Sequence, residues 1–310
     1  MDDYTAIAQT GATLVRMGLR MDVDAGGDGY AFQPGAHQEL LNQVGFARRT
    51  GLRIIPVLRP EPTPESRLWS DERLQTSLAH HWSGLARELA GRTEVAAFDL
   101  VNEPHPPGLT FAQKNARWAD LAMRLAAAVR AQDADRCLIV EPSPGARPMG
   151  FETATPLPLA NVAYSLHMYE PFEFTHQRVG DPRFTAVVDY PAVVPGQGRW
   201  DRERLRRELE PARSFGERHR WRIYVGEFGA ARWAPGASRE RYLRDLIGLF
   251  NEWGWSWTYH AWREWQGWDA EMGPGGAADS LRAIRNQTEP TFVALREGFA
   301  KDCGGGGGGA

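Results

Sequence analysis

Short apolar runs of strand length alternate with helix-period segments along nearly the whole chain, and this alternation constrains the fold more than any other feature. Several runs are continuously apolar, as expected for parallel strands buried on both faces. Because no linker interrupts the alternation, it predicts an α/β fold, and a TIM (β/α)8 barrel in preference to an open sheet. The predicted strands are Thr13–Leu19, Leu52–Leu58, Val95–Val101, Cys137–Glu141, Val162–His167, Ile223–Glu227 and Trp255–His260. The predicted helices are Gly35–Thr50, Asp71–Leu89, Thr110–Ala131, Arg202–Arg218, Ser238–Trp253 and Glu289–Ala300.

The sequence supplies seven strands where such a barrel needs eight. The chain opens with a predicted helix, Asp2–Gln9, which would normally follow a first strand. We therefore expect one barrel domain over residues 1–301 that lacks its first strand, followed by a flexible glycine-rich tail over residues 302–310. The segment Met168–Trp200 is rich in Pro, Gly and aromatic residues, which predicts a long loop on the active-site side after the sixth barrel strand. Asp71 is expected to cap the helix that follows it.

Composition excludes several classes of protein. The net charge is −3 with both signs interspersed, which argues against a nucleic-acid partner. No stretch approaches the ~18 apolar residues of a membrane span, and the opening residues do not form a secretory signal. The only cysteines, Cys137 and Cys303, predict no disulfide framework. Twelve Trp suit stacking on sugar faces, and we expect a monomer whose localisation the sequence leaves open.

Two glutamates each end a short apolar run. Glu103 closes the run that begins at Ala97, within Asn102-Glu103-Pro104, and Glu227 closes the run that begins at Ile223. This pattern predicts buried strands that deliver a carboxylate to their C-terminal ends, where barrel enzymes place their chemistry. Paired carboxylates are what acid/base cleavage of a glycosidic bond requires. The alternative for an isolated match is a polar turn at a strand exit.

Other side chains interrupt or end apolar strands in the same way. Arg16 interrupts one, and a buried guanidinium needs an anionic partner, which a catalytic carboxylate would supply. His167 ends another, and alternation places Tyr169 on the same side. Trp262 follows the last strand. The alternatives are a core histidine for His167 and simple packing for Trp262.

Taken together, these residues resemble glycoside hydrolase family 5, the cellulase-type retaining β-glycosidases. The resemblance covers about residues 3 to 300. The matching motifs occur in the same order as in the family and are Val15-Arg16, Asn102-Glu103-Pro104, His167-Met168-Tyr169, Gly226-Glu227-Phe228 and Trp262. The family's opening strand has no counterpart here, which is a second reason to expect a truncated barrel and leaves secretion open.

The resemblance implies hydrolysis by double displacement. Glu227 would be the nucleophile, kept ionised by Arg16 and by a hydrogen bond from Tyr169. Glu103 would be the acid/base, with a pKa raised by burial and by the charge of Glu227. The two carboxyl groups are then expected about 5–5.5 Å apart.

The resemblance also implies the sugar contacts. Asn102 would bond the 2-hydroxyl, His167 would contact the sugar or orient the site, and Trp262 would form the floor under the cleaved sugar. The residues expected to extend that floor are Trp233, Trp265 and Trp268. Neither a metal nor an organic cofactor is implied.

The substrate remains open within this reading. An endo-β-1,4-glucanase is favoured, with a β-mannanase or an exo-β-1,3-glucanase of the same family as alternatives. Two readings from other classes compete. One is a carbohydrate-binding pseudoenzyme. The other is a phosphate-binding barrel, which the carboxylate of Glu227 disfavours, since it would repel an anion at the end of the seventh barrel strand.

Overall fold

The computed structural model describes residues 2–60, 67–274 and 285–302. The chain forms two compact units, each built from separate stretches of sequence. Unit 1 comprises Met1–Leu166 and Pro211–Tyr224, and unit 2 comprises His167–Glu210 and Val225–Ala310. The single domain predicted over residues 1–301 stays a prediction, and the predicted tail lies outside the described residues from residue 303 on.

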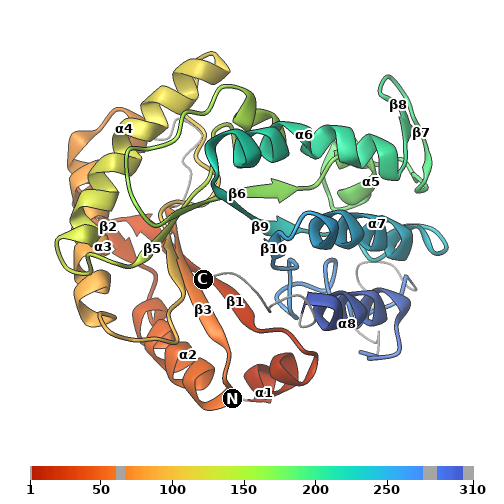
Figure 1. Ribbon diagram of the computed structural model, residues 1–310, viewed down its shortest axis with the longest axis horizontal. Coiled ribbons are helices and arrows are strands. Elements are labelled where there is room, and N and C mark those ends of the chain that lie inside the picture. Colours follow the sequence, from red (N-terminus) through yellow and green to blue (C-terminus); the bar gives the residue numbers. More distant parts are fainter. Residues whose placement is uncertain (1, 61–66, 275–284, 303–310) are drawn as a thin grey trace. The chain divides into compact units, whose positions relative to one another are not determined.

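A parallel sheet runs through unit 1 (Figure 1). Strand β1 pairs with β3 in parallel over eight residues, from Leu14↔Arg53 to Met21↔Pro60, and β3, β4, β5 and β6 follow in parallel. The short β2 is antiparallel to the end of β1, and β9 borders β6. The bounds are β1 (Leu14–Val23), β2 (Tyr30–Phe32), β3 (Arg53–Pro60), β4 (Ala97–Asp99), β5 (Cys137–Val140), β6 (Val162–Met168) and β9 (Arg222–Phe228).

Helices connect these strands. Asp71 caps the N-terminus of α3, as predicted, by accepting the Arg73 N–H at 3.0 Å. Thr110 caps α4 and forms a capping box with Gln113. Residues 141–161, between β5 and β6, contain a 3-10 helix and no α-helix. The elements are α1 (Asp2–Gln9), α2 (Ala36–Thr50), η1 (Arg67–Trp69), α3 (Glu72–Glu88), α4 (Phe111–Arg130), η2 (Pro148–Glu152) and the second half of α6 (Arg202–His219).

The core of unit 1 lies on both faces of its sheet. One cluster joins inward residues of neighbouring strands, namely Ile55, Ala97, Ile139 and Tyr224. On the other face Trp82 of α3 packs against Phe98 with ring centroids 5.0 Å apart. Its indole N–H donates to the Leu100 carbonyl at 2.9 Å, so this fully buried side chain also satisfies a backbone group just after β4.

Unit 2 holds the C-terminal ends of β6 and β9, with β10 next to β9. The Thr258 N–H donates to Val225 O at 2.9 Å and the His260 N–H to Phe228 O at 3.1 Å, which keeps the chain beside β9 after β10 ends. Helices α7 and α8 pack side by side (Figure 1). The elements are α5 (Phe172–Thr175), η3 (Pro182–Phe184), the β7 (Ala192–Val194) and β8 (Gly198–Trp200) hairpin, the first half of α6, α7 (Ser238–Glu252), β10 (Ser256–Trp257) and α8 (Pro290–Asp302).

All seven predicted strands and all seven predicted helices are present, with bounds shifted by a few residues. Sequence patterns missed β2 and the short elements inside Met168–Trp200, which was predicted as a loop. Within the described residues, no helix combines the length and the apolar character that crossing a membrane requires.

Candidate active site

Arg16 is the centre of the polar cluster in unit 1. Its Nε donates to Asp99 Oδ2 at 2.9 Å, and its Nη2 donates to Glu141 Oε1 at 2.7 Å. Both carboxylates are fully buried. The prediction that Arg16 has an anionic partner is therefore confirmed, although sequence analysis named neither of these two. Its predicted influence on Glu227 stays a prediction. Removing Arg16 would break two buried ion pairs, which typically costs about 3–5 kcal/mol per broken pair.

Arg16 also fixes the side-chain amide of Asn102, which follows β4. Its Nη2 donates to Asn102 Oδ1 at 3.0 Å. Because a guanidinium only donates, Oδ1 is the acceptor and Nδ2 is the donor end of this amide. Asn102 can therefore offer an N–H to a hydroxyl group, as the predicted contact to a sugar 2-hydroxyl requires.

Glu103 has a left-handed backbone, with φ of 50°. A non-glycine residue in this region is strained, and such positions concentrate at functional sites. Its N–H donates to Glu141 Oε2 at 2.6 Å, so a buried carboxylate holds the backbone in place. The side chain is exposed. This exposure corrects the expectation that Glu103 is buried.

Glu227 lies in unit 2, one residue before the end of strand β9. Its side chain is buried, with only 5% of the residue exposed. Tyr169 donates its hydroxyl to Glu227 Oε2 at 3.0 Å, which confirms the predicted hydrogen bond. His260 Nδ1 lies 2.8 Å from the same oxygen. His167 Nδ1 lies 4.0 Å from it, so His167 and Tyr169 do face the same side as alternation predicted. Hydrogen bonds to a carboxylate favour its ionised form.

His260 was missed as a site residue, although it ends the last predicted strand in the same manner as the two glutamates. The other ring nitrogen, Nε2, lies 3.6 Å from Glu264 Oε2. Gly229 permits this arrangement, because a Cβ there would lie 2.7 Å from the His260 carbonyl oxygen. The missing side chain therefore lets the end of β9 approach the backbone of His260.

The predicted aromatic residues of unit 2 form a continuous cluster that reaches the site. Ring centroids are 5.8 Å apart for Trp233 and Trp265, 5.6 Å for Trp265 and Trp268, and 5.9 Å for Trp268 and Tyr169. Trp265 is 38% exposed, whereas Trp233 is 8% exposed and donates its indole N–H to Gln177 O. Trp265 therefore has an exposed ring, and Trp233 packs against it from the buried side. Their predicted contact with a sugar stays a prediction.

Trp262 contacts helix α8 and the residue that follows it. Its ring lies 6.4 Å from that of Phe292 in α8, and the Arg263 guanidinium stacks on it at 4.5 Å. Its predicted role as the floor under a sugar stays a prediction.

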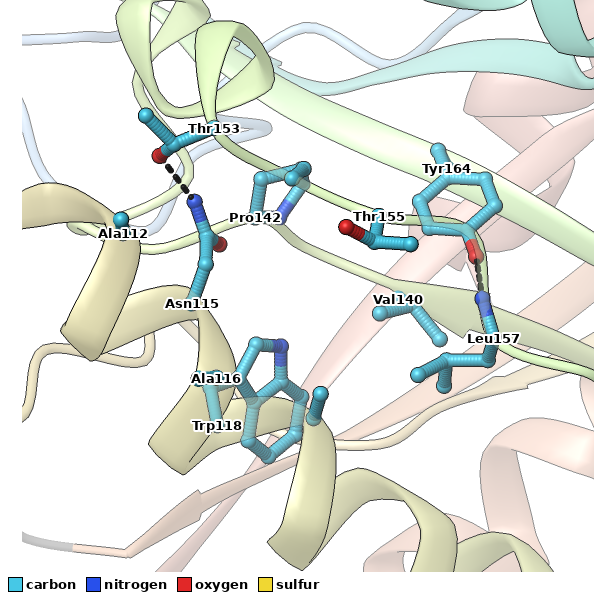
Figure 2. Close-up of a pocket in the computed structure, with 12 residues that line it drawn as sticks. Ala112, Asn115, Ala116, Trp118, Val140, Pro142, Thr153, Thr155, Leu157 and Tyr164 are labelled. Carbon is cyan, nitrogen blue, oxygen red and sulfur yellow. Dashed lines mark hydrogen bonds between the residues drawn. The ribbon is translucent and has the colours of Figure 1, made fainter.

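A separate cavity of about 100 Å³ lies in unit 1 between α4 and the β5–β6 strands. Figure 2 shows the small side chains of Ala112 and Ala116 beside it, and the hydrogen bonds from Asn115 to Thr153 and from the Leu157 N–H to Tyr164. The indole N–H of Trp118 is buried at its wall with no hydrogen-bond partner. Its lining side chains are uncharged, so this cavity is unlike the carboxylate site.

Comparison with solved structures defines the fold class. The structure is similar to that of the endoglucanase Cel5A from Thermotoga maritima, with a TM-score of 0.74 and 21% sequence identity over 95% of this chain and 89% of that chain. The fold is therefore that of the (β/α)8 barrels, as the alternation of strands and helices predicted.

Sequence comparison defines the family. The profile of Cellulase (glycosyl hydrolase family 5) matches residues 2–266, and the chain belongs to this family. It is 27% identical over 229 residues to Endoglucanase C from Acetivibrio thermocellus and, to the same extent, to Endoglucanase C307 from Clostridium sp. (strain F1). Each match covers 66% of this chain and 65% of the relative, so the chain spans slightly less than two thirds of the curated relatives that it matches.

Proposed function

We propose that the protein is a retaining β-glycoside hydrolase, with Glu227 as nucleophile and Glu103 as acid/base. The observation that carries this proposal is the state of Glu227. Its carboxylate is buried near a strand end and receives two hydrogen bonds on one oxygen, from Tyr169 and His260. Such surroundings favour the anion that a nucleophile must be.

The two half-reactions need different properties from the two carboxyl groups. In the first, Glu227 forms a bond to the anomeric carbon while Glu103 gives its proton to the departing oxygen. In the second, Glu103 takes a proton from water, which displaces Glu227 and restores the original anomeric configuration. The exposed position of Glu103 supports this double role, because water and leaving group must both reach it.

A β-1,4-glucan cleaved in an endo fashion is the proposed substrate. The endoglucanase relatives support this choice, as do the exposed ring of Trp265 and the donor end of Asn102. A β-mannan or a β-1,3-glucan attacked from its end are the alternatives within the family.

The test is hydrolysis of a panel of β-1,4-glucan, β-mannan and β-1,3-glucan, with the products sized during the reaction. We expect a rapid fall in the viscosity of carboxymethylcellulose and a range of oligosaccharides. Release of one sugar unit from chain ends would contradict endo action. Absence of turnover on 2,4-dinitrophenyl β-cellobioside, together with binding of cello-oligosaccharides, would instead favour a carbohydrate-binding pseudoenzyme.

A further inference from the structure

His260 links two carboxylates in unit 2. Its Nδ1 is 2.8 Å from Glu227 Oε2, and its Nε2 is 3.6 Å from Glu264 Oε2. The His260 side chain is 18% exposed, whereas that of Glu264 is 50% exposed. The ring therefore separates a buried carboxylate on one side from a solvent-facing carboxylate on the other.

The contact to Glu227 fixes the hydrogen on the ring. An ionised carboxylate can only accept hydrogen bonds, so Nδ1 must carry a proton whenever Glu227 is the anion. Tyr169 donates to the same oxygen at 3.0 Å, whereas His167 Nδ1, at 4.0 Å, is beyond direct hydrogen-bond distance. Two donors on Oε2 restrict rotation of the carboxylate and so define the direction in which Oε1 points.

The protein backbone holds His260 in this position. The His260 N–H donates to Phe228 O at 3.1 Å, one residue after Glu227. The space that Gly229 leaves beside the His260 carbonyl lets the two segments meet. Glu264 lies four residues further along, and its carboxylate is 3.6 Å from the outer ring nitrogen, beyond hydrogen-bond distance.

We propose that His260 is a positioning residue for the nucleophile, and that it acts by donating Nδ1–H to Glu227 Oε2. This inference rests on the proposed function. It predicts that His260 increases the rate at which Glu227 attacks the anomeric carbon. It also predicts that this effect depends on the Nδ1–H donor and not on the shape of the ring.

The experiment compares three substitutions in the full chain. His260→Phe keeps a ring and removes the donor, His260→Asn keeps an N–H near the position of Nδ1, and Glu264→Gln removes the outer charge. Inactivation by 2,4-dinitrophenyl 2-deoxy-2-fluoro-β-cellobioside isolates the attack of Glu227, because its leaving group departs without an acid. The inactivation rate constant, the inhibitor dissociation constant and the melting temperature are measured for each variant.

We expect His260→Phe to slow inactivation by about 10- to 100-fold, the effect of losing one hydrogen bond to a charged group. The dissociation constant should change little. His260→Asn should recover the rate to within about fivefold of the wild type, and Glu264→Gln should change it by about threefold or less.

Equal rates for His260→Phe and the wild type would overturn the inference, as would His260→Asn behaving like His260→Phe at unchanged melting temperature. If the wild type itself is neither labelled on Glu227 nor active on any aryl β-glycoside, the proposed function fails and the inference fails with it. Labelling of the wild type on Glu227 with unaffected His260 variants leaves the proposed function standing and removes only the role of His260.

Discussion

At the scale of single residues, Glu103 and Glu227 end strands in the same way but have opposite surroundings. Glu227 is buried and receives hydrogen bonds from two side chains, whereas Glu103 is exposed and is held through its backbone N–H. Environment rather than residue type assigns roles to a carboxylate pair. The proposed roles can therefore be separated by substitution.

Glu227→Gln is expected to abolish turnover on every substrate, because an amide cannot form the glycosyl-enzyme bond. Glu103→Ala should still complete the first step on 2,4-dinitrophenyl β-cellobioside, whose leaving group needs no proton, and should stall at the second. Azide should then restore turnover of Glu103→Ala by about 10-fold or more and yield a β-glycosyl azide, because it needs no general base. Rates with and without azide, and the anomeric configuration by NMR, provide the measurement.

The same experiment contains its own control. Azide should not yield a β-glycosyl azide with Glu227→Gln, since that product requires two successive displacements. Finding the β-azide with Glu227→Gln and not with Glu103→Ala would show that the two roles are exchanged.

The sequence predicted the residues at strand ends better than their partners. Glu103 and Glu227 were predicted because a polar residue ending an apolar run is a local signal, and Tyr169 because alternation places it on the same side as His167. Glu141 and His260 carry the same signal, since each follows an apolar strand, yet only their contacts to Arg16 and Glu227 distinguish them from turn residues. Asp99 lies inside an apolar run as Arg16 does, and the pairing of the two depends on strand order, which a single strand does not encode.

At the scale of elements, the segment after β6 is held by aromatic contacts around His176. Its ring packs against Tyr169 at 5.3 Å and Trp268 at 5.1 Å, and Nδ1 lies 2.9 Å from the Thr175 hydroxyl. Burial lowers the pKa of His176 to about 4. The folded protein thus keeps this ring neutral where the unfolded chain, with an ordinary pKa of about 6.5, takes up a proton.

This difference predicts how stability changes with pH. Between pH 6.5 and 4 the unfolded state binds more protons than the folded state at His176, so the free energy of unfolding falls as the pH is lowered. The loss from this one group should reach roughly 2–3 kcal/mol near pH 4. Urea unfolding at pH 7.5 and pH 4.5 should show a smaller loss for His176→Phe than for the wild type.

The matched control is Phe111→Leu, a substitution of an exposed aromatic residue at the start of α4. It removes no titratable group, so it should leave the difference between the two pH values unchanged. An equal loss of stability in the wild type and in His176→Phe would contradict the assignment to His176.

The cavity beside α4 follows from the connection between β5 and β6. This connection has the short η2 instead of an α-helix, and α4 presents small side chains toward the gap (Figure 2). Ala116→Leu should fill part of the cavity with a good helix former and stabilise the protein by about 0.5–1 kcal/mol. Ala127→Leu, on the same helix and away from the cavity, should change stability by less than about 0.5 kcal/mol. Equal effects of the two substitutions in thermal unfolding would mean that filling the cavity does not stabilise the protein.

At the scale of the whole molecule, the order of the longer strands and helices could be predicted because each of them has its own periodic pattern of apolar residues. The short elements within Met168–Trp200 could not be predicted, because residues distant in the sequence stabilise them. Tyr190 illustrates this, since it packs on Phe174 and Tyr242 and its hydroxyl donates to Asp245 in α7 at 2.7 Å. A three-residue strand has too few positions to show a period, so β2, β7 and β8 were also missed.

Three elements run from one unit into the other. The boundary falls between Leu166 and His167 in β6, between Glu210 and Pro211 in α6, and between Tyr224 and Val225 in β9. Unfolding either unit therefore breaks hydrogen-bonded elements that also belong to its neighbour. We expect one cooperative transition in calorimetry, with equal calorimetric and van't Hoff enthalpies.

One core substitution in each unit tests whether the two units unfold together. Phe98 and Phe250 are both fully buried, the first in unit 1 and the second in unit 2. Phe98→Ala and Phe250→Ala should each cost about 3–5 kcal/mol and lower the temperature of the same single transition. If the units unfolded independently, Phe98→Ala would instead split the calorimetric trace and leave an unshifted transition from unit 2. Far-ultraviolet circular dichroism and tryptophan fluorescence, followed through the same temperature range, should then give different midpoints, whereas one cooperative unit requires that they coincide.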